Sequence, residues 1–110
     1  NDADRINSWH LFPIRLRLES LEIDRNEFIE KLKNKGVGCS VHWRPLHMHP
    51  LYRVRLGWHE SHFPAATQLW KEIISLPIFS SMTCEEMVHV AEMVKEICTA
   101  HKVNTVSRAA

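Results

Sequence analysis

Alternating apolar and polar positions near the start of the chain predict a β-strand between residues 11 and 18. Every second position from Phe12 to Leu18 is apolar, and the positions between them hold a proline and two arginines. The strand therefore has one apolar face and one polar face. Proline has no backbone N–H to donate to a neighbouring strand, so Pro13 predicts that this strand lies at an edge of its sheet.

A helix with clear start and stop signals follows. Asp24 suits the N-cap position, and Glu27 lies three residues later, as in a capping box. The predicted buried side consists of the apolar residues at helical spacing, Phe28, Ile29 and Leu32. Gly36 favours the left-handed backbone conformation that commonly ends a helix, so we expect the helix to stop just before it.

The segment 37–43 is predicted to form a second strand. Its odd-numbered residues are large or sulfur-containing, whereas the even-numbered ones are glycine, serine and histidine. This second face has little bulk, and a ligand or another backbone could approach it closely. Residues 44–50 are predicted to form a loop, because Pro45 and Pro50 interrupt any regular element.

Two more helices are predicted in the second half of the chain. The first begins at Pro64, a residue type suited to the first helical position, and continues to residue 73. A short extended piece covers residues 75–79. The last helix has Thr83 as its N-cap and Glu86 as the matching capping-box residue. Its predicted buried stripe consists of Met87, Val90, Ala91, Val94, Ile97 and Cys98.

The order of these elements predicts an α/β fold: a small sandwich in which helices cover a three-stranded sheet. A length of 110 residues suits one domain and not two. We expect the domain to span residues 1–103. Residues 104–110 are expected to form a flexible tail, because the apolar pattern does not continue there.

Composition and charge argue against several classes of protein. Hydrophobic residues make up 45% and charged residues 25%, which is typical of a globular protein. The net charge of +1 gives no basic surface for nucleic acid, and no apolar run approaches the ~20 residues needed to span a membrane. The three cysteines are odd in number and widely spaced, so we expect a reducing, cytoplasmic location.

Histidines are concentrated between residues 42 and 62 and allow two chemical interpretations. Cys39 and His42 have the separation of a zinc-ligand pair, with His47 and His49 nearby. We favour solvated loop histidines instead, because an odd offset places Cys39 and His42 on opposite faces of a regular strand. Cys39 could also be a nucleophile with His42 as its base, but its apolar face favours a buried structural thiol. We therefore expect no metal ligand and no catalytic residue.

A series of short motifs resembles the small domain of DegT/StrS-type aminotransferases. The motifs are WHLFPIR at 9–15, DRNEFIEKL at 24–32, GVGCSVHWRPLH at 36–47, FPAA at 63–66, SLPIF at 75–79 and MTxxE at 82–86. Each is short, but their order and spacing cover almost the whole chain.

The resemblance implies that the chain is the detached C-terminal small domain of a pyridoxal-phosphate-dependent enzyme with the aspartate-aminotransferase-type fold. Such enzymes act as homodimers and transfer an amino group, usually from glutamate, to a keto sugar carried on a nucleotide. A lysine and an aspartate of a large N-terminal domain, missing here, hold the cofactor. No lysine of this chain matches that position, so we expect no cofactor-binding residue and no activity from the isolated chain.

The resemblance also implies where the domain meets its substrate. The segment matching residues 41–47 lines the active-site entrance in such enzymes. The predicted substrate-binding residues are therefore His42, Trp43, Arg44 and His47, with His47 nearest the sugar. Trp43 replaces the tyrosine that is usual at its position.

A missing large domain would leave an apolar surface uncovered on this one, and Trp9, Trp43 and Leu46 are its candidate residues. One alternative to an aminotransferase domain is a free-standing small α/β module that binds a ligand or a metal, and another is a structural or dimerisation piece without a ligand. A gene that encodes only this segment would favour the first of these.

Overall fold

The β-sheet has two antiparallel strands, β1 (Phe12–Arg15) and β2 (Ile73–Leu76), with Phe12 opposite Leu76 and Arg15 opposite Ile73. The computed structural model describes residue 4 and residues 6–103. The expected tail at 104–110 lies outside the described residues. The α/β class is confirmed, and β1 forms the central part of the strand predicted at 11–18.

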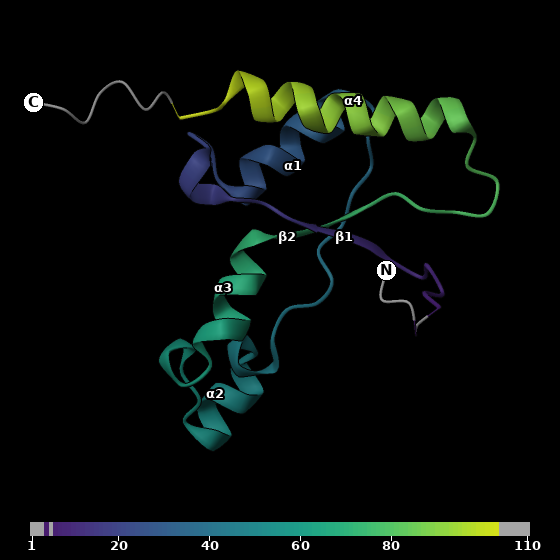
Figure 1. The fold of residues 1–110 in the computed structure, drawn as a ribbon. Helices are drawn as coiled ribbons and strands as arrows, with labels where there is room; N and C mark the ends of the chain where they lie inside the picture. Colours follow the sequence, from purple (N-terminus) through teal and green to yellow (C-terminus); the bar gives the residue numbers. More distant parts are fainter. Residues whose placement is uncertain (1–3, 5, 104–110) are drawn as a thin grey trace, which may run out of the picture.

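Helices make up most of the remaining structure. The longer ones are α1 (Arg25–Asn34), α2 (Pro50–Leu56), α3 (Pro64–Glu72) and α4 (Cys84–Ala100). Short 3-10 helices occupy Leu18–Ser20, Leu46–Met48 and Glu60–His62, so part of the predicted loop at 44–50 is helical. In Figure 1, α1 and α4 lie together on one side of the strands, and α2 and α3 lie on the other.

The ends of α1 are set by the residues that predicted them. The Asp24 carboxylate accepts hydrogen bonds from the backbone N–H groups of Asn26 and Glu27, at 2.7 and 2.9 Å, and the Glu27 carboxylate accepts one from the Asp24 N–H. Gly36 has φ of 78°, in the left-handed region. A capping box also begins α4, at Thr83 and Glu86. These local signals are confirmed.

The hydrophobic core lies between α1, α4 and the strands. Its buried members are Leu16, Phe28, Ile29, Leu32, Val37, Ile74, Val90 and Ile97. The predicted stripe of α1 is confirmed. The predicted stripe of α4 is only partly buried, because Met87 and Ala91 are exposed.

The prediction of a three-stranded sheet is wrong. The segment 37–43 forms no strand and contributes a single antiparallel bridge, in which Ser40 exchanges both backbone hydrogen bonds with Ser75. The next bonded pair in one direction would need an N–H from Pro77, which has none. In the other direction the Ile73 N–H is already donated to the Leu69 carbonyl, where α3 ends. The bridge therefore lacks a donor on the β2 side for a complete hydrogen-bonded pair in either direction.

The edge position predicted from Pro13 agrees with the register. Pro13 lies opposite Ser75, whose backbone N–H and C=O are both bonded to Ser40 on the other side of β2. In an antiparallel pair of this type the backbone groups of both residues point away from each other. The nitrogen of Pro13 therefore points outward, where its lack of a hydrogen costs no ladder bond.

Candidate functional site

The predicted substrate-binding segment is anchored at its C-terminal end by His47. The side chain of His47 is only 3% exposed, and its Nε2 lies 2.9 Å from the hydroxyl oxygen of Thr67. That hydroxyl donates its own hydrogen to the Glu60 carbonyl at 3.2 Å. The hydrogen of the first bond must then belong to His47 Nε2, so Nδ1 is the ring nitrogen that this bond leaves unused.

An aromatic cluster surrounds this anchor and joins α2 to α3. The His47 ring stacks on Phe63 at 4.9 Å between centroids. Trp58 contacts Phe63 edge-on at 5.2 Å and stacks on Tyr52 of α2 at 5.6 Å. Such aromatic pairs add to the stability gained by burying their area. The cluster gives the α2–α3 part of the molecule packing contacts of its own, away from the core under α4.

The N-terminal end of the segment is anchored by His42. Its Nδ1 lies 3.0 Å from the hydroxyl oxygen of Ser75, a buried residue of β2. Arg44 lies between the two anchors, and its carbonyl oxygen accepts a hydrogen bond from His49 Nε2 at 3.3 Å. The segment 42–47 is thus fixed to the sheet at one end and to α3 at the other.

Side chains between the anchors point outward. Trp43 is 77% exposed, and Arg44 and Leu46 are also exposed. The structure therefore places an aromatic face and a guanidinium group on the surface of an anchored loop, and turns His47 inward. An indole can stack on a planar ring, and a guanidinium can bind phosphate through two parallel hydrogen bonds. The loop is suited to binding and holds no acid–base pair.

Cys39 is not poised for nucleophilic chemistry. His42, the base considered for it, is bonded to Ser75. Burial raises the pKa of the Cys39 thiol, which disfavours the reactive thiolate. Cys39 packs against the hydrophobic core, as expected of a structural thiol. Across residues 6–103, no three His, Cys, Asp or Glu side chains lie close enough together to hold a metal ion.

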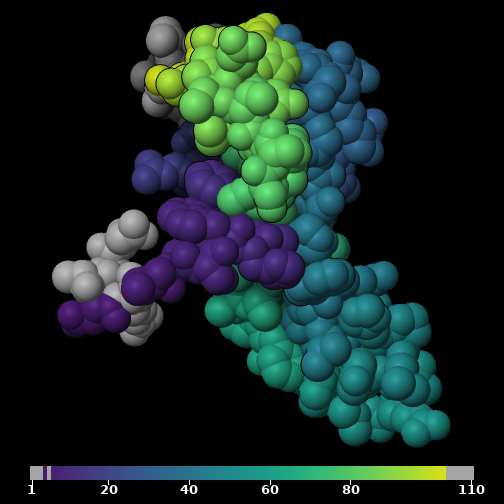
Figure 2. All heavy atoms as spheres, turned by 90° about the vertical axis from the view of Figure 1, so that its right-hand side faces the viewer, coloured from purple at the N-terminus to yellow at the C-terminus, as the bar shows by residue number. Residues whose placement is uncertain are grey.

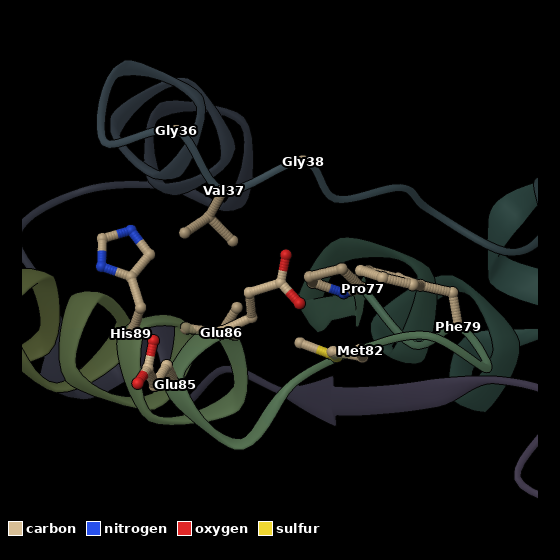
Figure 3. A pocket seen from close by; sticks show the side chains of 10 residues that line it. Gly36, Val37, Gly38, Pro77, Phe79, Met82, Glu85, Glu86 and His89 are labelled. Atoms are coloured by element: carbon tan, nitrogen blue, oxygen red, sulfur yellow. The ribbon is translucent and has the colours of Figure 1, made fainter.

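A hollow of about 570 Å³ lies away from this loop, between the end of α1 and the start of α4 (Figure 3). Its rim includes the backbone of Gly36 and Gly38, and the carboxylates of Glu85 and Glu86 supply negative charge. His89 Nε2 lies 3.1 Å from the Lys35 carbonyl oxygen beside it. The small residues at 36–38 were the only sequence signal for this space, and none of the predicted substrate-binding residues lines it.

The lysines of the chain lie at or near its surface. None of them is buried: they are Lys31, Lys33, Lys35, Lys71, Lys95 and Lys102. Lys33 and Lys35 each form an ion pair at 2.8 Å, with Glu30 and Glu96. The bond to Glu30 raises the pKa of Lys33. A lysine that reacts with a carbonyl group must be neutral at working pH, and burial or a neighbouring cation is what achieves this.

The fold and the loop together define a small α/β domain that presents an exposed indole and guanidinium on an anchored segment. The chain belongs to the DegT/DnrJ/EryC1/StrS aminotransferase family, whose model matches residues 1–95. It is 40% identical over 96 residues to the uncharacterized protein MJ1066 of Methanocaldococcus jannaschii, covering 87% of this chain and 25% of that protein. It is 35% identical over 95 residues to the spore coat polysaccharide biosynthesis protein SpsC of Bacillus subtilis, covering 86% of this chain and 24% of that protein.

Solved structures give the same result. The putative sugar aminotransferase Spr1654 from Streptococcus pneumoniae, in its PMP-form, superposes with a TM-score of 0.74 at 30% identity, covering 83% of this chain and 22% of that one. A PLP-form of the same protein gives the same score. The resemblance found in the sequence is therefore confirmed. The chain spans about a quarter of the length of these relatives. No helix in the described part of the chain is long and apolar enough to cross a membrane.

Proposed function

We propose that this chain is the C-terminal small domain, residues 1–103, of a pyridoxal-phosphate-dependent aminotransferase. The parent transfers an amino group from glutamate to a keto sugar carried on a nucleotide, acts as a cytoplasmic homodimer, and holds the cofactor in a large domain outside this chain. Membership of the family over residues 1–95, in a chain a quarter as long as its relatives, carries the proposal. When bound, the cofactor supplies the electron sink for the transfer.

The anchored loop supports a role on the substrate side. Trp43 and Arg44 have the exposed surface to contact the nucleotide sugar, and His42 supports them through its bond to Ser75 of β2. His47 has its Nε2 engaged by Thr67, so only Nδ1 is left for a ligand. An acceptor nitrogen suits a sugar hydroxyl, which can donate to it. We therefore retain His42, Trp43, Arg44 and His47 as the substrate-binding residues.

Variants of His47 in the full-length parent test this role. We expect His47→Ala to lower kcat/KM for the sugar by about tenfold, the equivalent of about 1.4 kcal/mol, and to leave cofactor affinity nearly unchanged. His47→Gln keeps a donor toward Thr67 and removes Nδ1, so it separates anchoring from substrate contact. The control is His59→Ala, because His59 is an exposed histidine in the same α2–α3 part of the molecule.

Two outcomes would change the role assigned to His47. Full activity of His47→Gln would assign His47 to anchoring alone. Unchanged kinetics of His47→Ala would remove it from the substrate-binding set.

An experiment on the isolated chain tests the expectation that it has no aminotransferase activity of its own. Because every lysine is at the surface, we expect pyridoxal phosphate and borohydride to label no single lysine stoichiometrically, as measured by peptide mass spectrometry. Stoichiometric labelling of one lysine would contradict the proposal. A gene that encodes this segment alone would favour the free-standing module.

A further inference from the structure

Ser75 is a buried polar residue in the short, otherwise apolar strand β2. It is only 4% exposed, and its neighbours in the strand are Ile74 and Leu76. A buried hydroxyl lowers stability unless it forms a hydrogen bond. The partner of this hydroxyl is His42, whose Nδ1 lies 3.0 Å from it. The serine is therefore explained by its contact with His42 and not by packing within the strand.

The Ser75 side chain lies on the face of the sheet that is turned away from the hydrophobic core. Successive side chains of a strand point to opposite faces, and the preceding residue, Ile74, is a fully buried member of the core. Pro13, directly opposite Ser75 on β1, shares its face. Removing the Ser75 hydroxyl therefore leaves the core contacts of β2 in place and affects the residue bonded to it on the other face, His42.

The bond to Ser75 orients the His42 ring, and this ring in turn contacts Trp43. The His42 and Trp43 rings meet edge-on, with 4.7 Å between their centroids and an angle of 66° between their planes. Trp43 is 77% exposed, so little of its surface is left for other contacts. The orientation of the exposed indole therefore depends on His42, and through His42 on a hydroxyl of β2.

The place of this segment in the molecule adds weight to the contact. Residues 40–45 connect the body that contains α1 and α4 with α2 and α3, which project from that body in Figure 2. The segment contains no helix or longer strand and is attached to β2 by the Ser40–Ser75 bridge, with backbone bonds of 2.7 and 3.1 Å. The bridge holds the backbone at Ser40, and the Ser75 hydroxyl holds the side chain two residues later. Ser75 thus makes both attachments.

We propose that Ser75 is a positioning residue for the substrate-binding loop: through His42, it holds the Trp43 indole in the orientation that meets the sugar substrate. This inference rests on the proposed function. Because Ser75 is buried, it has almost no surface for a ligand and acts through His42. The expected signature is weaker binding of the sugar substrate, with the chemical step left unchanged.

Ser40 provides a matched control, because it belongs to the same bridge and its own side chain is exposed. Nuclear magnetic resonance of the indole N–H groups in the 110-residue chain measures the mobility of each tryptophan. We expect Ser75→Ala to lower the heteronuclear NOE of the Trp43 indole to roughly half of its original value, because the side chain becomes free to rotate. Ser40→Ala should leave this NOE unchanged. His42→Phe keeps a ring beside Trp43 and removes the bond, so it should act like Ser75→Ala.

Kinetics of the full-length parent test the consequence for the substrate. The probe is the nucleotide-linked keto sugar that the parent converts fastest among UDP-, dTDP- and GDP-linked forms. We expect Ser75→Ala to raise KM for this sugar about fivefold, the effect of one lost hydrogen bond, with kcat and the KM for glutamate nearly unchanged. Combining Ser75→Ala with His42→Phe should raise KM no further than the larger single effect, because both changes remove the same bond.

Other results would overturn the proposal or the function on which it rests. An unchanged Trp43 signal in Ser75→Ala would refute the positioning role and leave the proposed function intact. Additive effects of the two changes on KM, or an equal rise in Ser40→Ala, would show that Ser75 does not act through His42. A parent that converts none of these sugars, with the Trp43 signal still lowered in Ser75→Ala, would refute the proposed function and with it the substrate role of Ser75, and leave the contact itself intact.

Discussion

Replacing Thr67 by valine removes a hydroxyl without changing the shape of the side chain, and we expect it to loosen the 42–47 loop. In the structure this hydroxyl joins His47 to the Glu60 carbonyl. Without it, His47 Nε2–H has no acceptor, and both His47 and Thr67 are buried, so water replaces the lost contact poorly. The Glu60 carbonyl keeps the hydrogen bond that it accepts from the Phe63 N–H at 3.1 Å, so it is not left without a donor.

The cost is therefore that of one buried, unsatisfied donor, about 1–3 kcal/mol. For a small domain, a loss of about 2 kcal/mol moves the urea midpoint down by roughly 1 M. Thr67→Ser restores the hydroxyl and loses one methyl group, so its midpoint should lie close to that of the original chain. The pair of variants thus separates the hydrogen bond from the packing.

Urea unfolding followed by circular dichroism gives the midpoints, and hydrogen exchange of residues 44–63 shows whether the loosening is local. An unchanged midpoint and unchanged exchange in Thr67→Val would refute the reasoning, since the buried donor would then cost nothing. Equal losses in Thr67→Val and Thr67→Ser would assign the effect to the methyl group.

Four other substitutions test the fold. Asp24→Ala and Thr83→Ala each remove an N-cap and should cost about 1 kcal/mol in urea unfolding, the first more because Asp24 accepts two backbone bonds. Leu32→Ala empties a fully buried site and should cost about 2–5 kcal/mol; a loss below that of either cap would contradict the core described. Hydrogen bonds from Arg15 and Gln68 lower the pKa of Glu72, so its contribution is present at neutral pH and is lost as pH falls through the lowered pKa. Glu72→Gln should therefore flatten the acid side of the stability–pH curve, and an unchanged slope would show that the pair is not coupled to folding.

Sequence reasoning succeeded where a signal acts within a few residues. Asp24, Gly36 and Thr83 determine helix ends through bonds to groups at most a few positions away, so their residue types are sufficient evidence. The apolar side of α1 is equally local, because helical spacing alone decides which residues share a face.

Prediction failed where the outcome depends on a distant partner. The strand expected at 37–43 needed donors on β2, and Pro77 and the end of α3 remove them. His47 is buried because Thr67 and Phe63 lie against it, and no pattern around residue 47 reveals those neighbours. The stripe of α4 shows which residues are apolar and cannot show that this chain leaves Met87 uncovered.

The short sheet has a consequence for aggregation. At the outer edge of β1, Pro13 offers no donor, and the next residue whose backbone points outward, Arg15, carries a charged side chain. At the outer edge of β2, the N–H groups of Ser75 and Ile73 are already used. A strand from another molecule thus finds almost no unpaired edge on either side among the described residues. As an isolated domain, the chain should associate through side-chain surfaces, in contacts that dilution reverses, and not through the strand pairing that builds fibrils.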